Sequence, residues 1–192
     1  MTNDYTPPPR TPGVPDPSVA GQLTANSFPD PVLGFTGKAV RPQEGEYNPN
    51  GTWVHAKDGT QAAYESVPQC AAISFSKIPT PRSALAATYL GEHERPGNGL
   101  ALEFSDSTKA KAFFTLYARQ LKGCPHTGDA ELVVGDLDVG SATIVSRRTY
   151  SGSQMWSEMI KVSGRIVMLI IIADDHHSSL ASLRSTAQAL LP

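Results

Sequence analysis

Four consecutive residues near the C-terminus, Asp174, Asp175, His176 and His177, form the densest group of potential metal ligands in the sequence. Carboxylates and imidazoles bind zinc and other divalent metals. Adjacent residues at a helix start point in different directions, however, and Asp at such a place is explained by N-capping and by the helix dipole. We therefore expect no bound metal and no cofactor, and we expect Asp174 or Asp175 to cap a helix.

A second group of chemically capable residues lies on a predicted strand, residues 154–162. Alternation places one set of side chains on one face and the other set on the opposite face: Trp156, Glu158, Ile160 and Val162 against Met155, Ser157, Met159 and Lys161. If the face with Trp156 is covered, Glu158 points into an apolar surface, where the pKa of its carboxyl rises unless a cation pairs with it.

Three interpretations of this strand stay open. Glu158 could line a ligand cleft beside Trp156. Alternatively the Met face is the buried one and Glu158 is solvated. Thirdly, Arg147 and Arg148 on the preceding strand point to opposite faces, so one of them could form a cross-strand ion pair with Glu158. Trp156, Glu158, Arg147 and Arg148 are the predicted ligand-binding residues.

Motifs of known catalytic machinery do not occur in the sequence. It contains no Gly-x-Ser-x-Gly elbow, phosphate-binding loop or dinucleotide fingerprint, and Cys70 and Cys124 have no obvious activating histidine. We therefore expect a protein that is not an enzyme, with a hydrolase of dispersed catalytic residues as an alternative. The two cysteines are either free thiols or one disulfide, which would stabilise the fold by about 4 kcal/mol and require an oxidising compartment.

The composition limits the classes of partner and the number of domains. A chain of 192 residues with 40% hydrophobic content can form one domain with a sizeable core. A net charge of -2 provides no overall field that would attract nucleic acid or anionic lipid. We expect no nucleic-acid partner. The longest apolar run, at residues 166–173, is too short to span a bilayer as a helix and predicts a strand buried on both faces.

Residues 1–48 are predicted to form a Pro-rich, disordered tether. Prolines are spread through Thr, Gly, Asp, Asn and Ser, a composition that favours extended conformers, although Val32, Leu33 and Phe35 could dock on the domain. The segment is similar to the spacer that follows the lipidated cysteine of a bacterial lipoprotein. On that hypothesis the native N-terminus carries a lipid anchor; the alternative is a cytosolic protein with an unstructured N-terminus.

Residues 49–192 are predicted to form a single α+β domain. After a strand candidate at 53–56 we expect a short helix from Ser66 to Ile73, then a hairpin of strands 83–91 and 100–104. An amphipathic helix follows to Lys122, with an apolar stripe of Ala110, Phe113, Phe114, Tyr117 and Leu121. Four strands in a meander and a C-terminal helix complete the domain. The predicted fold is an antiparallel sheet of about six strands with two main helices packed mostly on one face.

Several of these segments together carry a family resemblance over roughly residues 60–190. They are Val67-Pro68-Gln69-Cys70, residues 107–114, Leu121-Lys122-Gly123-Cys124, the strand after Gly164 and the terminal amphipathic helix. The chain resembles the extracytoplasmic sensor-like domain of PknH-type receptor kinases and of many actinobacterial lipoproteins. The resemblance implies export, a disulfide between Cys70 and Cys124, and ligand sensing or binding rather than catalysis.

The leading hypothesis is an exported, lipid-anchored domain in the cell envelope. It would bind a small molecule, a lipid or an envelope component in a cleft between the sheet and its covering elements. The alternative in another class is a protein-interaction module that docks an envelope protein on an exposed strand or on the face with Met155 and Met159.

Overall fold

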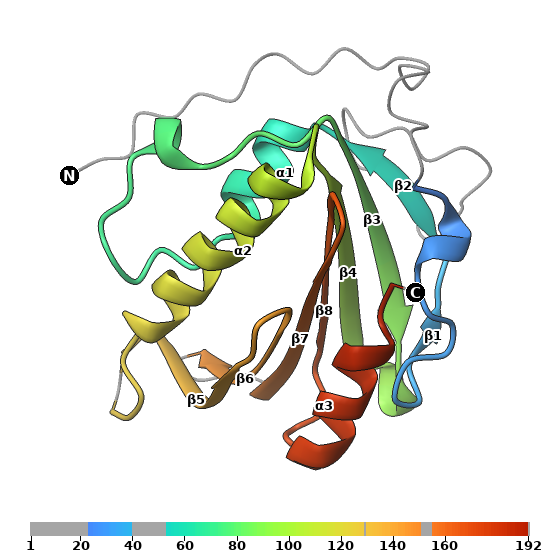
Figure 1. Cartoon of the computed structure of the whole chain (residues 1–192). Coiled ribbons are helices and arrows are strands. Elements are labelled where there is room, and N and C mark those ends of the chain that lie inside the picture. The colour runs from blue at the N-terminus through green and yellow to red at the C-terminus, as the bar shows by residue number, and fades with distance from the viewer. Residues whose placement is uncertain (1–22, 40–52, 129, 151–154, 192) are drawn as a thin grey trace.

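The computed structural model describes residues 23–39, 53–128, 130–150 and 155–191, and within them it shows one antiparallel sheet of eight strands (Figure 1). The strands are β1 (Thr36–Gly37), β2 (Val54–Lys57), β3 (Ser83–Leu90), β4 (Pro96–Glu103), β5 (Leu132–Val139), β6 (Thr143–Tyr150), β7 (Met155–Ser163) and β8 (Ile166–Ile172). Their spatial order is β1-β3-β4-β8-β7-β6-β5, and β2 also pairs with β3. The α+β class and the antiparallel sheet are confirmed; β2 corresponds to the strand candidate at 53–56, and with β1, which was not predicted, the sheet has more than the predicted six or so strands.

Three α-helices cover the two faces of the sheet: α1 (Gly59–Ser66), α2 (Ser107–Lys122) and α3 (Leu180–Ala189). Helices α1 and α2 pack on one face, whereas α3 packs on the other (Figure 1). The prediction that both main helices lie mostly on one face is therefore wrong. The reason is β8, which is central and apolar on both sides, so that Leu169 needs a cover on one face and Ile170 on the other.

Helix α2 forms as its sequence predicts. Asp106 caps the N-terminus by accepting a hydrogen bond from the backbone N–H of Lys109, and the helix ends at Lys122 with Gly123 as its C-cap. Its apolar stripe, including Phe113 and Tyr117, is buried against the sheet.

No helix in the described part of the chain is long and apolar enough to span a membrane.

Helix α1 occupies a different place from the predicted short helix. The structure begins it at Gly59, with the side chain of Asp58 accepting from the backbone N–H of Gln61, and ends it at Ser66. Asp58 and Gly59 suit a turn as well as a helix start, so the local sequence does not by itself predict a helix there. The segment after Ser66 leads instead to Cys70, which forms a disulfide with Cys124 across 54 positions of sequence. This pairing confirms what the family resemblance implied.

Part of the predicted tether belongs to the fold. Between residues 23 and 37, four apolar side chains are buried on the face that α3 covers: Leu23, Phe28, Val32 and Phe35. Tyr89 donates a hydrogen bond to the carbonyl of Pro29 at 2.8 Å, and β1 pairs with the end of β3. The prediction of a tether up to residue 48 is thus corrected for this segment. Residues 1–22 and 40–48 of it lie outside the described residues.

Candidate functional site

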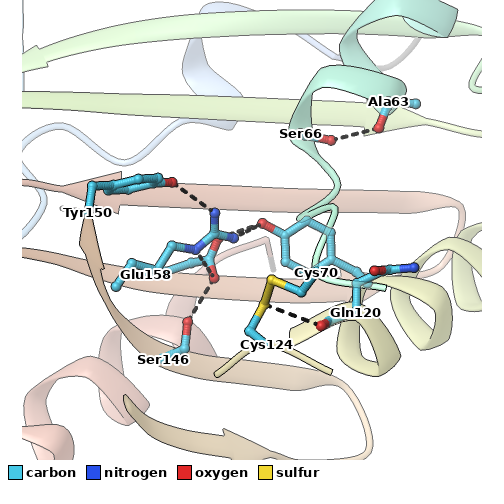
Figure 2. Close-up of polar contacts among 10 residues, drawn as sticks. Ala63, Ser66, Cys70, Gln120, Cys124, Ser146, Tyr150 and Glu158 are labelled. Carbon is cyan, nitrogen blue, oxygen red and sulfur yellow. Dashed lines mark hydrogen bonds and ion pairs between the residues drawn. A yellow bond between two sulfur atoms is a disulfide. The ribbon is translucent and has the colours of Figure 1, made fainter. Parts of the chain in front are cut away.

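A buried polar cluster joins α2 to the sheet, and it contains two of the predicted site residues. Glu158 of β7 and Arg148 of β6 point to the face that α2 covers, where Tyr117 of α2 contacts both of them. Glu158 and Ser146 are labelled in Figure 2. Ser146, directly opposite Glu158 in the β6–β7 register, lies on the same face. The cluster therefore depends on strand alternation and on the packing of α2.

Four hydrogen bonds hold the Glu158 carboxylate. One oxygen accepts from the Tyr117 hydroxyl and from an Arg148 guanidinium nitrogen, and the other accepts from the Ser146 hydroxyl at 2.8 Å and from Arg148 Nε at 3.2 Å. The side chains of Arg148 and Glu158 are 6% and 2% exposed. The cross-strand ion pair is confirmed, and the interpretation of a solvated Glu158 is wrong.

Burial and charge set the protonation of this cluster. Burial raises the pKa of the Tyr117 hydroxyl well above its usual value; the positive charge of Arg148 lowers it in part, and Glu158 raises it further. For Arg148, burial lowers the pKa, but the negative charge of Glu158 outweighs that effect and the net pKa is above the usual value. The cluster therefore holds a neutral tyrosine and a cation, and both of them contact Glu158.

The other two predicted residues are not part of this cluster. Trp156 is half-buried and sits opposite Arg148 in the register, on the same face. Arg147 points to the opposite face, where it donates to the carbonyl of Ser178 at 2.8 Å and lies 3.5 Å from Asp136. The Met face is not open either: Met159 is fully buried, and only Met155 is exposed.

The Asp-His segment forms a tight turn before α3. Asp174 is buried, and its carboxylate accepts from the Ser157 hydroxyl and from the backbone N–H groups of His176 and Ser178. The helix begins later, with Ser179 as its cap. The expected capping by Asp174 or Asp175 is wrong, because the Asp174 side chain closes a turn that begins five residues before the cap Ser179.

A groove runs between the outer side of α2 and the turn that joins β5 to β6. It has a volume of about 440 Å³ and is lined by Lys111, Phe114, Thr115, Ala118, Arg119, Lys122, Val139, Gly140 and Ser141. We call it the α2 groove. A second hollow of about 380 Å³ shares Lys111, Thr115 and Arg119 with it and continues along the helix.

The α2 groove was missed by sequence reasoning. The available signal was the composition of α2, which contains Lys109, Lys111, Arg119 and Lys122 and no acidic residue. That signal does not reveal the opposite wall, because Val139 to Ser141 lie far along the chain and reach the helix only through the fold.

The end of α2 beside the groove is fixed in place. Cys124, two residues after Lys122, forms the disulfide with Cys70 (Figure 2), and the side chain of Gln120 accepts a hydrogen bond from the backbone N–H of Ala71 at 3.0 Å. These two links attach the C-terminal turn of α2 to the segment that follows α1.

Comparison with known proteins shows a distant likeness only. No family model matches the chain, and no curated protein matches it. Among solved structures, the extracellular domain of PknH from Mycobacterium tuberculosis aligns with 16% identity and a TM-score of 0.45. The alignment covers 56% of this chain and 61% of that domain, so this chain matches less than two thirds of its length.

Proposed function

We propose that this chain is an extracytoplasmic, non-catalytic domain that binds a ligand in the α2 groove. The observation that carries the proposal is the groove itself, which lies between α2 and the turn that joins β5 to β6. Its volume is within the range of small-molecule sites, and it combines an apolar floor with a few polar side chains at the rim.

The disulfide supports the extracytoplasmic part of the proposal. Bonds such as the one between Cys70 and Cys124 form and persist in oxidising compartments and are rare in the cytosol. With the resemblance of the sequence to sensor-like domains and to lipoprotein spacers, this leads us to propose further that the domain is exported, held at the membrane by an N-terminal lipid anchor, and acts in sensing.

The polar cluster supports a structural role more than a catalytic one. All four hydrogen bonds of the Glu158 carboxylate go to neighbouring side chains, so the carboxylate presents no lone pair toward solvent as a general base requires. Met159 is buried, so the face with Met155 and Met159 offers no continuous docking surface.

Binding in the groove is tested by filling it from the solvent side. Thr115 is exposed and lines both hollows, so Thr115→Phe blocks the groove without changing the core. We expect the wild-type protein to bind the neutral fluorophore Nile red, and Thr115→Phe to bind it at least several-fold more weakly. Ala181→Phe, at an exposed position of α3 on the other face, is the matched control and is expected to bind normally. Equal binding by wild type and Thr115→Phe would refute the groove as the site.

The compartment is tested by intact mass with and without reductant and alkylation, on protein recovered from cells that export it. The expected mass is that of one disulfide, with no alkylation before reduction. Two freely alkylating thiols in the folded protein would refute the proposed location.

A further inference from the structure

We infer that the α2 groove binds an anionic amphiphile, a molecule with a phosphate or carboxylate head and an apolar tail. This inference rests on the proposed function and specifies the class of ligand. Three features support it: the cations along α2, the absence of carboxylate partners for them within the described residues, and the apolar floor of the groove.

Three cations lie along one side of the helix. Lys111, Arg119 and Lys122 all line the groove, all are exposed, and at 100° per residue they fall within an arc of about 80°. The stripe is about 16 Å long at 1.5 Å per residue, with Arg119 and Lys122 one turn apart and Lys111 at the other end. Arg119 and Lys122 are thus near enough to contact one anionic head together.

Lys111, Arg119 and Lys122 have no carboxylate partner within the described residues; the same is true of Lys38, Lys77, Arg82, Lys109 and Lys161, but the first three line one groove together. Within the described ranges, Lys57, Arg95, Arg147, Arg148, Arg165 and Arg184 each form an ion pair with a carboxylate. The same part of the chain contains no carboxylate paired with Lys111, Arg119 or Lys122, and α2 offers none at a spacing of three or four residues. The stripe therefore attracts an anion from outside the domain.

Helix stability does not account for the whole stripe. Cations in the last turn of a helix interact favourably with its dipole, which explains part of the presence of Arg119 and Lys122. Lys111 lies in the second turn of α2, outside the last turn in which the dipole favours a cation, so the dipole does not account for it. A ligand that extends along the helix explains all three.

The apolar floor of the groove is suited to the apolar tail of the inferred ligand. Phe114 and Ala118 are 6% and 7% exposed and form the base together with Val139. The adjoining hollow continues the apolar surface with Ala112 and Leu116. An inorganic anion would use the cations and leave this surface in water, whereas an amphiphile buries it along the helix. The net charge of -2 is a sum over the whole chain, so it does not reveal this local basic surface.

The inference is tested by calorimetric titration with three matched probes below their micelle concentrations. Oleoyl lysophosphatidic acid has the anionic head and the tail, oleoyl lysophosphatidylcholine has the tail with a zwitterionic head, and glycerol 3-phosphate has the anion alone. We expect lysophosphatidic acid to bind at least tenfold more tightly than either of the others. Arg119→Gln with Lys122→Gln is expected to weaken its binding about a hundredfold, since each charge-assisted hydrogen bond contributes about tenfold or more.

The matched control removes the same charges elsewhere. Lys77 and Arg82 are exposed and do not line the groove, so the double variant Lys77→Gln/Arg82→Gln is expected to bind lysophosphatidic acid as the wild type does. Normal binding by the Arg119/Lys122 double variant would overturn the inference, as would glycerol 3-phosphate binding as tightly as lysophosphatidic acid.

The remaining outcomes separate this inference from the proposed function. If both lysolipids bind equally and Thr115→Phe weakens both, the groove is a site but the anionic class is wrong. If neither lysolipid binds but Thr115→Phe still weakens the binding of Nile red, the groove is a binding site and the inferred class of ligand is wrong. If neither lysolipid binds and Thr115→Phe leaves the binding of Nile red unchanged, both the proposed function and this inference are refuted. Binding only to vesicles of phosphatidylcholine and phosphatidylglycerol would replace a single bound molecule with docking on a membrane surface.

Discussion

Truncation of the buried ion pair gives the most direct test of how α2 is held on the sheet. In Arg148→Met, the Glu158 carboxylate keeps its bonds from Tyr117 and Ser146 but loses the two from the guanidinium. Hydrogen bonds to charged groups contribute about 1.5–3 kcal/mol each, so two of them give about 3–6 kcal/mol. This agrees with the cost of about 3–5 kcal/mol for breaking a buried pair from one side. Glu158→Leu leaves the Arg148 guanidinium buried without its carboxylate partner, and we expect it to lower the free energy of unfolding by a similar amount.

The double variant Arg148→Met/Glu158→Leu should be far more stable than the sum of the two losses. Replacing both charges by apolar side chains removes the desolvation cost, so the remaining loss comes from the hydroxyls of Tyr117 and Ser146, at about 1–3 kcal/mol each. The coupling free energy between the two positions is therefore expected to be about 3 kcal/mol or more.

Urea unfolding followed by circular dichroism, with the disulfide intact, measures these changes. The loss in Arg148→Met should persist in high salt because the pair is buried. The matched comparison is Arg184→Met, which removes the pair with Asp138, whose side chains are 51% and 44% exposed; there we expect a loss below about 1 kcal/mol. If the effects of Arg148→Met and Glu158→Leu simply add in the double variant, the coupling described for this cluster does not exist.

Three further predictions concern the disulfide, the cap of α2 and the N-terminal segment. Replacing Cys70 and Cys124 by Ala should lower the free energy of unfolding by about 4 kcal/mol, given the 54-residue separation, and a urea midpoint equal to that of the oxidised wild type would contradict this. The backbone N–H of Lys109, the Ser105 hydroxyl and nearby charges lower the pKa of Asp106, so its contribution to stability is present above its usual pKa of about 3.9 and lost as the pH falls through the folded-state value. Asp106→Asn should therefore lose less stability than wild type in acid unfolding below about pH 4, and parallel profiles would refute that assignment. Tyr89→Phe removes the bond to the Pro29 carbonyl and should cost about 1 kcal/mol, with faster proteolysis between residues 23 and 37; unchanged cleavage would mean that the bond does not hold this segment.

The sequence predicts elements well where one pattern has a single solution. The apolar run of β8 fits only a strand buried on both faces, and the stripe of α2, bounded by Asp106 and Gly123, fits only a helix on a sheet. The alternation of β7 placed Glu158 correctly with respect to Trp156, but it did not say which face was covered, because both are. The covering of the second face depended on the position of α3, which no local sequence pattern predicts.

Other features could not be predicted because the deciding contacts are distant in sequence. Prolines indicated a tether before residue 48, whereas Phe28 and Phe35 pack on a surface of strands β3, β4 and β8, with their rings against Gly99 and Gly97 of β4. The pairing of Arg148, rather than Arg147, with Glu158 follows from which face α2 covers. The α2 groove likewise exists only because the β5–β6 turn lies beside the helix.

The two sides of α2 are chemically separated, and that separation explains why the polar cluster and the groove have different roles. Inward, Tyr117 is buried in a cluster whose charges cancel within the fold. On the groove side, Arg119 and Lys122 have no such partner within the described residues, and the disulfide two positions further on fixes the turn that carries them. Cations on a turn held by a covalent link lose less conformational entropy when they bind an anion than cations on a free helix end. The inner contacts and the disulfide therefore contribute to binding through the position of α2, without touching the ligand.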